Sequence, residues 1–136
     1  MKTILQVFIL VSLFFNFANG VEFKEIIDIT LKKDEVKKIL VKYDSKEKLL
    51  KFRWTLFVNN GLVVLRSYDK IVAQNILYMR HKNRSFRQEL RTKGADFYNT
   101  PYVLVRFKEF KHDTNEAVFE LLLSDASATI SLNYLK

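Results

Sequence analysis

The stretch Lys48–Val58, KLLKFRWTLFV, decides the fold because apolar and polar side chains alternate along it. Successive side chains of a β-strand point to opposite faces, so a strand with one buried face alternates in this way. Asn59, Asn60 and Gly61 follow directly, and these residue types accept the positive φ angles of a tight hairpin turn. A second apolar run begins at Leu62, so the sequence predicts a β-hairpin. The residues predicted on its first buried face are Leu50, Phe52, Trp54, Leu56 and Val58.

Shorter alternating segments lie on both sides of this hairpin. They recur about every ten residues with short polar turns between them, a spacing typical of antiparallel sandwiches and barrels. One or two weaker strands are expected between Ile71 and Leu90. The predicted fold is therefore an all-β antiparallel β-sandwich of about seven to nine strands, with a small antiparallel β-barrel as the alternative. The other predicted strands cover residues 23–31, 37–43, 102–110, 117–123 and 128–134.

Helical patterns are scarce in this sequence. Two short segments, residues 34–38 and 85–91, stay open as single helical turns. In the second of them Phe86 and Leu90 stand four positions apart, which is a helical spacing. No longer stretch has clean helical spacing, so we expect little helix. Segment 117–123 is apolar apart from one residue, and we expect it to be buried on both faces.

The first twenty residues have the organisation of a secretory signal peptide. Lys2 precedes an apolar stretch over residues 4–17, and the small residues Ala18 and Gly20 follow it. A positive start, an apolar centre and a small-residue cleavage site are typical of such peptides. The apolar stretch is shorter than the ~20 residues that span a bilayer, so we expect cleavage after Gly20. The predicted remainder is a single antiparallel β domain over residues 21–136 with no transmembrane segment.

The cysteine content limits both the compartment and the chemistry. The chain has no Cys, which excludes disulfides, thiolate metal sites and cysteine nucleophiles. Small secreted domains in oxidising compartments often depend on disulfides, whereas this domain must be stabilised by its apolar core. We therefore expect a periplasmic or secreted protein, most simply one that belongs to a bacterial cell envelope.

One segment concentrates the positive charge. The chain has 23 Lys and Arg against 15 Asp and Glu, a net charge of +8. In residues 80–93, RHKNRSFRQELRTK, six basic residues stand against the single acid Glu89, and Phe86 lies among them. Arginine binds carboxylate and phosphate groups in a bidentate manner. The candidate polyanion-binding residues are Arg80, Lys82, Arg84, Arg87, Arg91 and Lys93.

Two interpretations of this basic segment stay open. In the first, it contacts an anionic partner, either an envelope protein or an envelope component such as a lipid head group or a glycan. Nucleic acid is not expected as the partner of an exported protein. In the second, the segment is a solvated strand edge whose cations prevent aggregation between strands. The first interpretation predicts an exported, non-catalytic binding or assembly module of the bacterial cell envelope.

Carriage of a small apolar ligand is the first alternative function. A β-barrel, or the space between two sheets, can enclose such a ligand when a sufficient cavity is left between the side chains. The residues expected to line that cavity are Phe52, Trp54, Phe107 and Phe119.

Catalytic and metal-binding patterns are sparse, so we expect no enzyme activity, metal or cofactor. A zinc site needs three or four convergent ligands, and His81 and His112 are interpreted as solvated side chains in separate loops. With 3 Gly in the chain, a glycine-rich phosphate loop is excluded. A hydrolase with two carboxylates across a cleft is the second alternative function. Its candidate residues are Asp113, Glu116, Glu120 and Asp125.

Overall fold

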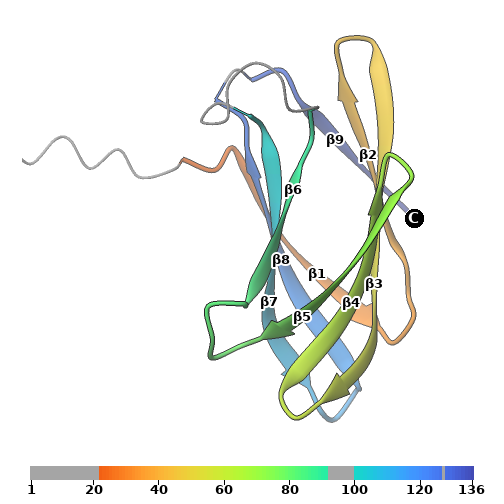
Figure 1. Ribbon diagram of the computed structural model, residues 1–136, viewed down its shortest axis with the longest axis vertical. Coiled ribbons are helices and arrows are strands. Elements are labelled where there is room, and N and C mark those ends of the chain that lie inside the picture. The colour runs from red at the N-terminus through yellow and green to blue at the C-terminus, as the bar shows by residue number, and fades with distance from the viewer. Residues whose placement is uncertain (1–21, 92–99, 127) are drawn as a thin grey trace, which may run out of the picture.

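The computed structural model describes residues 22–91, 100–126 and 128–136, which form nine β-strands and no helix (Figure 1). The strands build two antiparallel sheets that are not closed into a barrel. The predicted all-β antiparallel fold is confirmed, and its barrel alternative is wrong. The predicted signal peptide lies outside the described residues. The strands are β1 (Glu25–Lys32), β2 (Lys37–Tyr43), β3 (Lys46–Val58), β4 (Gly61–Tyr68), β5 (Ile71–Tyr78), β6 (Ser85–Glu89), β7 (Tyr102–Lys111), β8 (Glu116–Ser124) and β9 (Ser131–Leu135).

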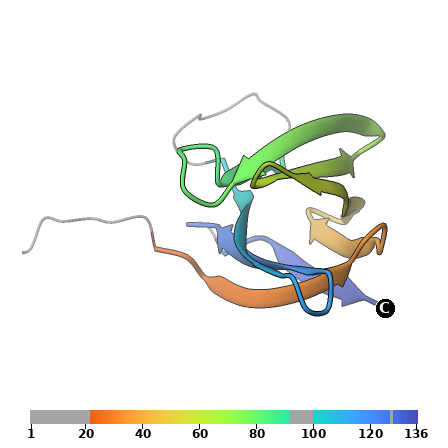
Figure 2. The same cartoon turned by 90° about the horizontal axis from the view of Figure 1, so that it is seen from below.

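The two sheets lie in separate layers (Figure 2). The four-stranded sheet has the order β1-β8-β7-β6, and the five-stranded sheet has the order β5-β4-β3-β2-β9. The strands β5 and β6 follow each other in the chain, yet they form the edges of different sheets. Because the chain passes from one sheet to the other between β5 and β6, the edges of these two strands lie near each other at one corner of the molecule.

Two-residue turns join the hairpins of the five-stranded sheet. Asn59 and Asn60 have φ angles of 51° and 62°, and the residues on either side of them, Val58 and Gly61, are paired. Positive φ at both central positions is the type I′ turn, whose twist matches that of the strands. The predicted hairpin is therefore confirmed. The same two-residue arrangement occurs at Asp44 and Ser45 and at Asp69 and Lys70.

The core fills the space between the sheets. Trp54 is 2% exposed, and its indole Nε1 donates a hydrogen bond of 2.9 Å to the carbonyl oxygen of Leu31. Phe52 and Phe119 pack edge to face with ring centroids 5.4 Å apart, and Phe107 lies 6.2 Å from Phe119. The four aromatic residues considered for an apolar ligand site are thus buried members of one packed cluster. Strand β8 has buried residues on both faces, as predicted.

The buried face predicted for β3 is wrong beyond Trp54. Leu56 and Val58 are 49% and 50% exposed, whereas Phe57 packs against the core. The register with β4 shifts between Trp54 and Leu56, which marks a β-bulge around Thr55. One extra residue in a strand reverses the face to which all later side chains point. Alternation in the sequence continues through the bulge and therefore does not reveal it.

The two segments that stayed open as helical turns are not helical. Residues 33–36 form a turn between β1 and β2, and residues 85–89 form β6. Phe86 pairs with Val105 of β7 and is 3% exposed. Strand pairing and burial therefore decide this conformation, because they outweigh a single helical spacing.

Candidate anion-binding cleft

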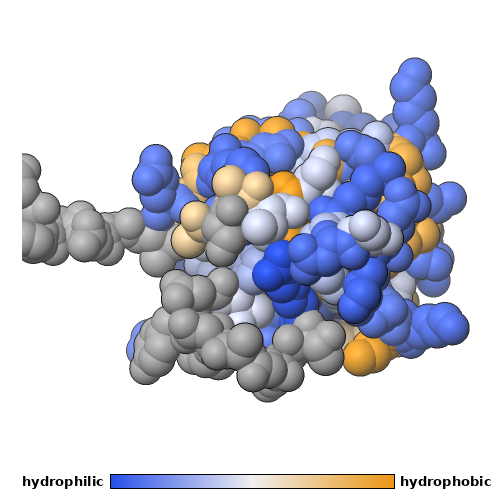
Figure 3. All heavy atoms as spheres, turned by 90° about the horizontal axis from the view of Figure 1, so that it is seen from above, coloured by the Kyte–Doolittle hydropathy of each residue, from blue (hydrophilic) through white to orange (hydrophobic). Residues whose placement is uncertain are grey.

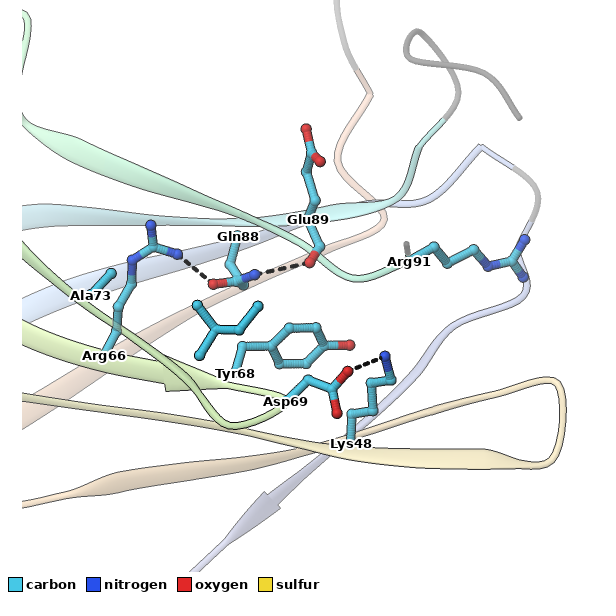
Figure 4. A pocket seen from close by; sticks show the side chains of 9 residues that line it. Lys48, Arg66, Tyr68, Asp69, Ala73, Gln88, Glu89 and Arg91 are labelled. Atoms are coloured by element: carbon cyan, nitrogen blue, oxygen red, sulfur yellow. Dashed lines mark hydrogen bonds and ion pairs between the residues drawn. The ribbon is translucent and has the colours of Figure 1, made fainter. Parts of the chain in front are cut away.

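A cleft of 280 Å³ lies between β5 and β6, at the corner where the two sheets approach each other. Close to the turn between these strands, Tyr78 N donates a hydrogen bond of 3.0 Å to the carbonyl oxygen of Asn83. The two strands diverge away from this turn (Figure 1). The cleft is lined by the start of β5 and the end of β6, which are the ends far from the turn. Its walls are formed by Lys48, Arg66, Tyr68, Asp69, Ile71, Ala73, Gln88, Glu89 and Arg91 (Figure 4).

Arg66 reaches across the cleft from β4 toward β6. Its Nε donates to Oδ1 of Asn75 at 2.9 Å. Its Nη1 donates to Oε1 of Gln88, as Figure 4 shows. The guanidinium carbon also lies 4.9 Å from the ring centroid of Phe86. Both acceptors are neutral amides, and no carboxylate of the described residues lies within 4.0 Å of this guanidinium. Burial lowers the pKa of Arg66, because desolvation disfavours a charge that lacks a nearby anion.

Lys48 and Asp69 form an ion pair at the rim of the cleft, with Nζ and Oδ2 2.6 Å apart. The hydrogen bond to Asp69 raises the pKa of Lys48. The carboxylate side chain is 51% exposed, and exposed ion pairs contribute only about 0 to 1 kcal/mol to stability. The end of the molecule that carries the β2–β3 and β4–β5 turns is mainly hydrophilic (Figure 3). An anion from solution can therefore compete for this lysine at little cost to the fold.

Tyr68 forms the floor of the cleft and joins the two sheets. It is 6% exposed, and its hydroxyl donates a hydrogen bond of 2.7 Å to the carbonyl oxygen of Leu90, just after β6. Burial raises the pKa of Tyr68 well above its usual range, since the buried phenol resists ionisation. The hydroxyl is therefore a hydrogen-bond donor throughout the neutral pH range.

Replacing Tyr68 with phenylalanine should lower the free energy of unfolding by about 1 kcal/mol near neutral pH, because one buried hydrogen bond is lost. In the wild type, the unfolded chain ionises this phenol above its ordinary pKa of about 10, while the folded chain keeps it protonated. The raised pKa thus stabilises the fold below about pH 10 and loses this contribution as the pH rises further. Urea unfolding at neutral and alkaline pH should show a smaller alkaline decrease for Tyr68→Phe than for wild type. Equal decreases would contradict this role.

The structure describes five of the six candidate residues of the basic segment and separates them from one another. Arg80 and Lys82 are exposed in the turn between β5 and β6. Arg87 is exposed on the edge strand β6, and its guanidinium carbon lies 3.7 Å from the ring centroid of Tyr102. Lys93 lies outside the described residues. The side chains of Arg80, Lys82 and Arg87 thus lie along the β5–β6 turn and the edge strand β6 and do not form one compact site.

Two further arginines of the segment are tied to other parts of the fold. The Nε of Arg84 donates a hydrogen bond of 2.9 Å to the carbonyl oxygen of Phe107 in β7. Nη2 of Arg91 lies 3.4 Å from Oδ2 of Asp44 and donates to the hydroxyl of Thr129 at 2.8 Å. Arg91 is the member of the predicted segment that also lines the cleft.

Sequence reasoning did not find Lys48 and Arg66. A signal for Arg66 is present in the sequence, because this cation shares the inward face of β4 with Leu62, Val64 and Tyr68. A charged residue on an otherwise apolar face needs a partner, since burying an unpaired charge is costly. Lys48 has no comparable signal, since it stands at the polar start of the alternating stretch.

The candidate catalytic carboxylates are distributed along β8 and its flanking turns. Asp113 is exposed in the turn before β8, and Glu116 is the first residue of the strand. Glu120 forms an ion pair with Arg106, with oxygen and nitrogen 3.1 Å apart. Asp125 follows the strand and is 6% exposed. None of these four acids lines the cleft between β5 and β6.

The two histidines lie in different turns. The ring of His81 packs against Tyr78 at 5.7 Å, and the ring of His112 packs against Phe110 at 5.0 Å. Within the described ranges, no group of three or more His, Asp or Glu side chains is placed to hold a metal ion.

Comparison of the chain with models of known protein families, with curated proteins and with solved structures found no match. The part of the chain that the structure describes contains no helix long and apolar enough to cross a lipid bilayer. Function is therefore inferred from the charge, burial and shape of the cleft.

Proposed function

We propose that this protein is an exported, non-catalytic binding or assembly module of the bacterial cell envelope that contacts an anionic partner at the cleft between β5 and β6. The observation that carries this proposal is the half-buried guanidinium of Arg66, whose hydrogen-bond acceptors are neutral amides. Such a cation has lost part of its contact with water without gaining a nearby counter-charge. A bound carboxylate or phosphate supplies that charge and accepts the remaining N–H groups.

The surrounding cations support the same function. Lys48 and Arg91 line the cleft together with Arg66, while Asp69 and Glu89 are its two acids. The exposed cations of the basic segment extend the positive charge outward along the β5–β6 turn and the edge of β6. Clusters of one charge raise the rate at which an oppositely charged partner arrives.

The proposed location follows from the first twenty residues, whose organisation favours export. In an envelope, the anionic partner is an acidic protein surface, a lipid head group or an acidic glycan. Nucleic acid is not proposed, because an exported protein does not normally meet it. No reaction is proposed, because the described residues that line the cleft include no serine, threonine or histidine to form a hydroxyl nucleophile with its base.

Arg66→Gln should weaken the binding of a fluorescent oligo-glutamate probe about tenfold at low ionic strength, since one charge-assisted contact is worth at least 1.4 kcal/mol. The matched control is Lys33→Gln, which removes the same charge from an exposed position in the β1–β2 turn. The control should change the affinity less than about twofold, because screening leaves distant surface charges little effect. Fluorescence anisotropy measures both affinities. Equal weakening by the two variants would show binding by net charge alone and would overturn the proposed site.

A further inference from the structure

We infer that the partner binds through an extended acidic segment that adds a strand to the open edge of β5. This inference rests on the proposed function, because it uses the same cleft and the same arginine. It adds the chemical class of the partner, a peptide strand, and the manner of its binding.

The peptide groups at the edge of β5 are available for such pairing. Tyr68 and Ile71 flank a two-residue turn and form a hydrogen-bonded pair. The next residue of β5, Val72, is therefore the first one whose N–H and C=O groups are directed away from β4. At the other end of β5, the N–H of Tyr78 is directed to Asn83 and therefore away from β4. Hydrogen-bonded and non-hydrogen-bonded positions alternate along an antiparallel pair. The N–H and C=O groups directed away from β4 are therefore those of Val72, Gln74 and Ile76.

Among the described residues, none of the features that usually prevent strand addition occurs at this edge. The strand reads IVAQNILY and contains neither a charged residue nor a proline. Ile71 and Val72 are 75% and 73% exposed, the highest values among the exposed large hydrophobic residues of the described chain. Protected edges are usually charged, short, interrupted by proline or covered by another element. A neutral edge strand without a neighbour in its sheet is the surface to which an extended peptide adds in β-augmentation, and β5 is such a strand among the described ones.

The inward side chains of an added strand would meet Arg66. Ala73 is the register partner of Arg66, and both residues line the cleft with Gln88 of β6 (Figure 4). Because Ala73 carries only a methyl group, it leaves the guanidinium accessible to a side chain that enters from the edge. A carboxylate beside Ala73 would then accept hydrogen bonds from Arg66 in a partly buried site, where charge-assisted bonds are strong.

The outward side chains of an added strand would meet apolar residues. Val72 and Ile76 lie on the opposite face from Ala73, since successive side chains alternate. Ile76 is the register partner of Val63, which in turn pairs with the exposed Leu56. The added strand is therefore expected to carry acidic residues on its inward face and apolar residues on its outward face.

A second copy of this chain satisfies these requirements less well. Two β5 edges could pair with each other and bury their apolar side chains. However, β5 contains no acidic residue, so this pairing would bring no carboxylate to Arg66. Charge complementarity therefore favours a partner whose strand carries Asp or Glu.

The test uses a short fluorescent peptide in which glutamate alternates with valine, and the variant Gln74→Pro. Gln74 has its N–H directed to the open edge, so proline there removes no hydrogen bond of the sheet but blocks strand addition. The matched control is Gln74→Ala, which removes the side chain and keeps the N–H. We expect Gln74→Pro to weaken peptide binding about tenfold and Gln74→Ala to change it less than about twofold. A peptide N-methylated on alternate residues should bind wild type equally weakly, which tests the pairing without altering the protein.

The outcomes separate this inference from the proposed function. If Arg66→Gln weakens binding but proline and N-methylation do not, the anion site stands and strand addition is overturned. If no glutamate-containing probe binds, both are overturned. If sedimentation shows a wild-type dimer that Gln74→Pro converts to a monomer, a second copy occupies the edge and the inference is overturned. Loss of binding on proline substitution and on N-methylation, with wild type monomeric, supports it.

Discussion

Replacing Trp54 with alanine should lower the free energy of unfolding by about 3 to 5 kcal/mol. The indole is 2% exposed, and its Nε1 donates a hydrogen bond of 2.9 Å to the carbonyl oxygen of Leu31. The ring also packs edge to face with Phe110, with centroids 5.6 Å apart. Alanine would leave a cavity between the sheets and a buried carbonyl without its donor. Both effects destabilise the fold because a core can collapse only in part around a deleted side chain.

Urea unfolding followed by circular dichroism measures this loss, because the variant removes the only tryptophan and with it the fluorescence signal. Trp54→Phe keeps an aromatic ring and loses the donor, so it should cost about 1 to 3 kcal/mol. Leu56→Ala is the matched control. Alternation in the sequence predicts that Leu56 and Trp54 lie on the same face of β3, but the bulge leaves Leu56 49% exposed. Its expected loss is below about 1 kcal/mol. A loss at Leu56 as large as that at Trp54 would contradict the bulge.

Asp125→Ala should lower the free energy of unfolding by about 2 to 3 kcal/mol, the range for a hydrogen bond to a charged group. The carboxylate side chain is 0% exposed, and its Oδ2 accepts a hydrogen bond of 2.7 Å from the N–H of Ile130. Nζ of Lys24 lies 3.8 Å from the same oxygen. Asp125 thus holds the connection through which the chain passes from β8 in one sheet to β9 in the other. Alanine would leave the N–H of Ile130 buried without an acceptor.

Asp125→Asn separates the two roles of this side chain, because an amide oxygen still accepts the hydrogen bond while the charge is removed. We expect it to retain more than half of the stability that alanine loses, because the hydrogen bond from Ile130 is kept and Nζ of Lys24 lies 3.8 Å away, beyond hydrogen-bond length. Lys24→Gln should therefore cost about 1 kcal/mol or less, since the lysine side chain is 44% exposed. Urea unfolding of the three variants measures how much the hydrogen bond and the charge of Asp125 each contribute to stability. If Asp125→Asn and Asp125→Ala lost equal stability, the negative charge of Asp125 would be what stabilises the fold, and not its hydrogen bond from Ile130.

Local chemistry made most of the strands predictable. The turn at Asn59 and Asn60 is visible in the sequence because few residue types accept two successive positive φ angles. The alternation in β2 predicts its buried residues Ile39, Val41 and Tyr43, since one face of that strand meets the core. These features depend on neighbours a few positions away in the chain.

The errors occurred where pairing across the sheet decides the structure. Leu56 follows the alternation of β3, but the register with β4 shifts before it and turns it outward. Phe86 and Leu90 have a helical spacing, yet both are buried in or beside an edge strand that pairs with β7. A bulge or a strand pairing depends on a partner that is distant in sequence, so local patterns do not report it.

The sequence alone determined an all-β chain with a concentrated basic segment and no cysteine chemistry, because alternation, turn residues and composition are local properties. The cleft was decided by the tertiary structure. It joins Arg66 of β4 to Gln88 of β6, two residues separated by 22 positions, because β5 and β6 enter different sheets. Pairing within each sheet aligns the edges, and packing between the sheets brings Gln88 of β6 to Arg66, a partner that no local pattern reveals.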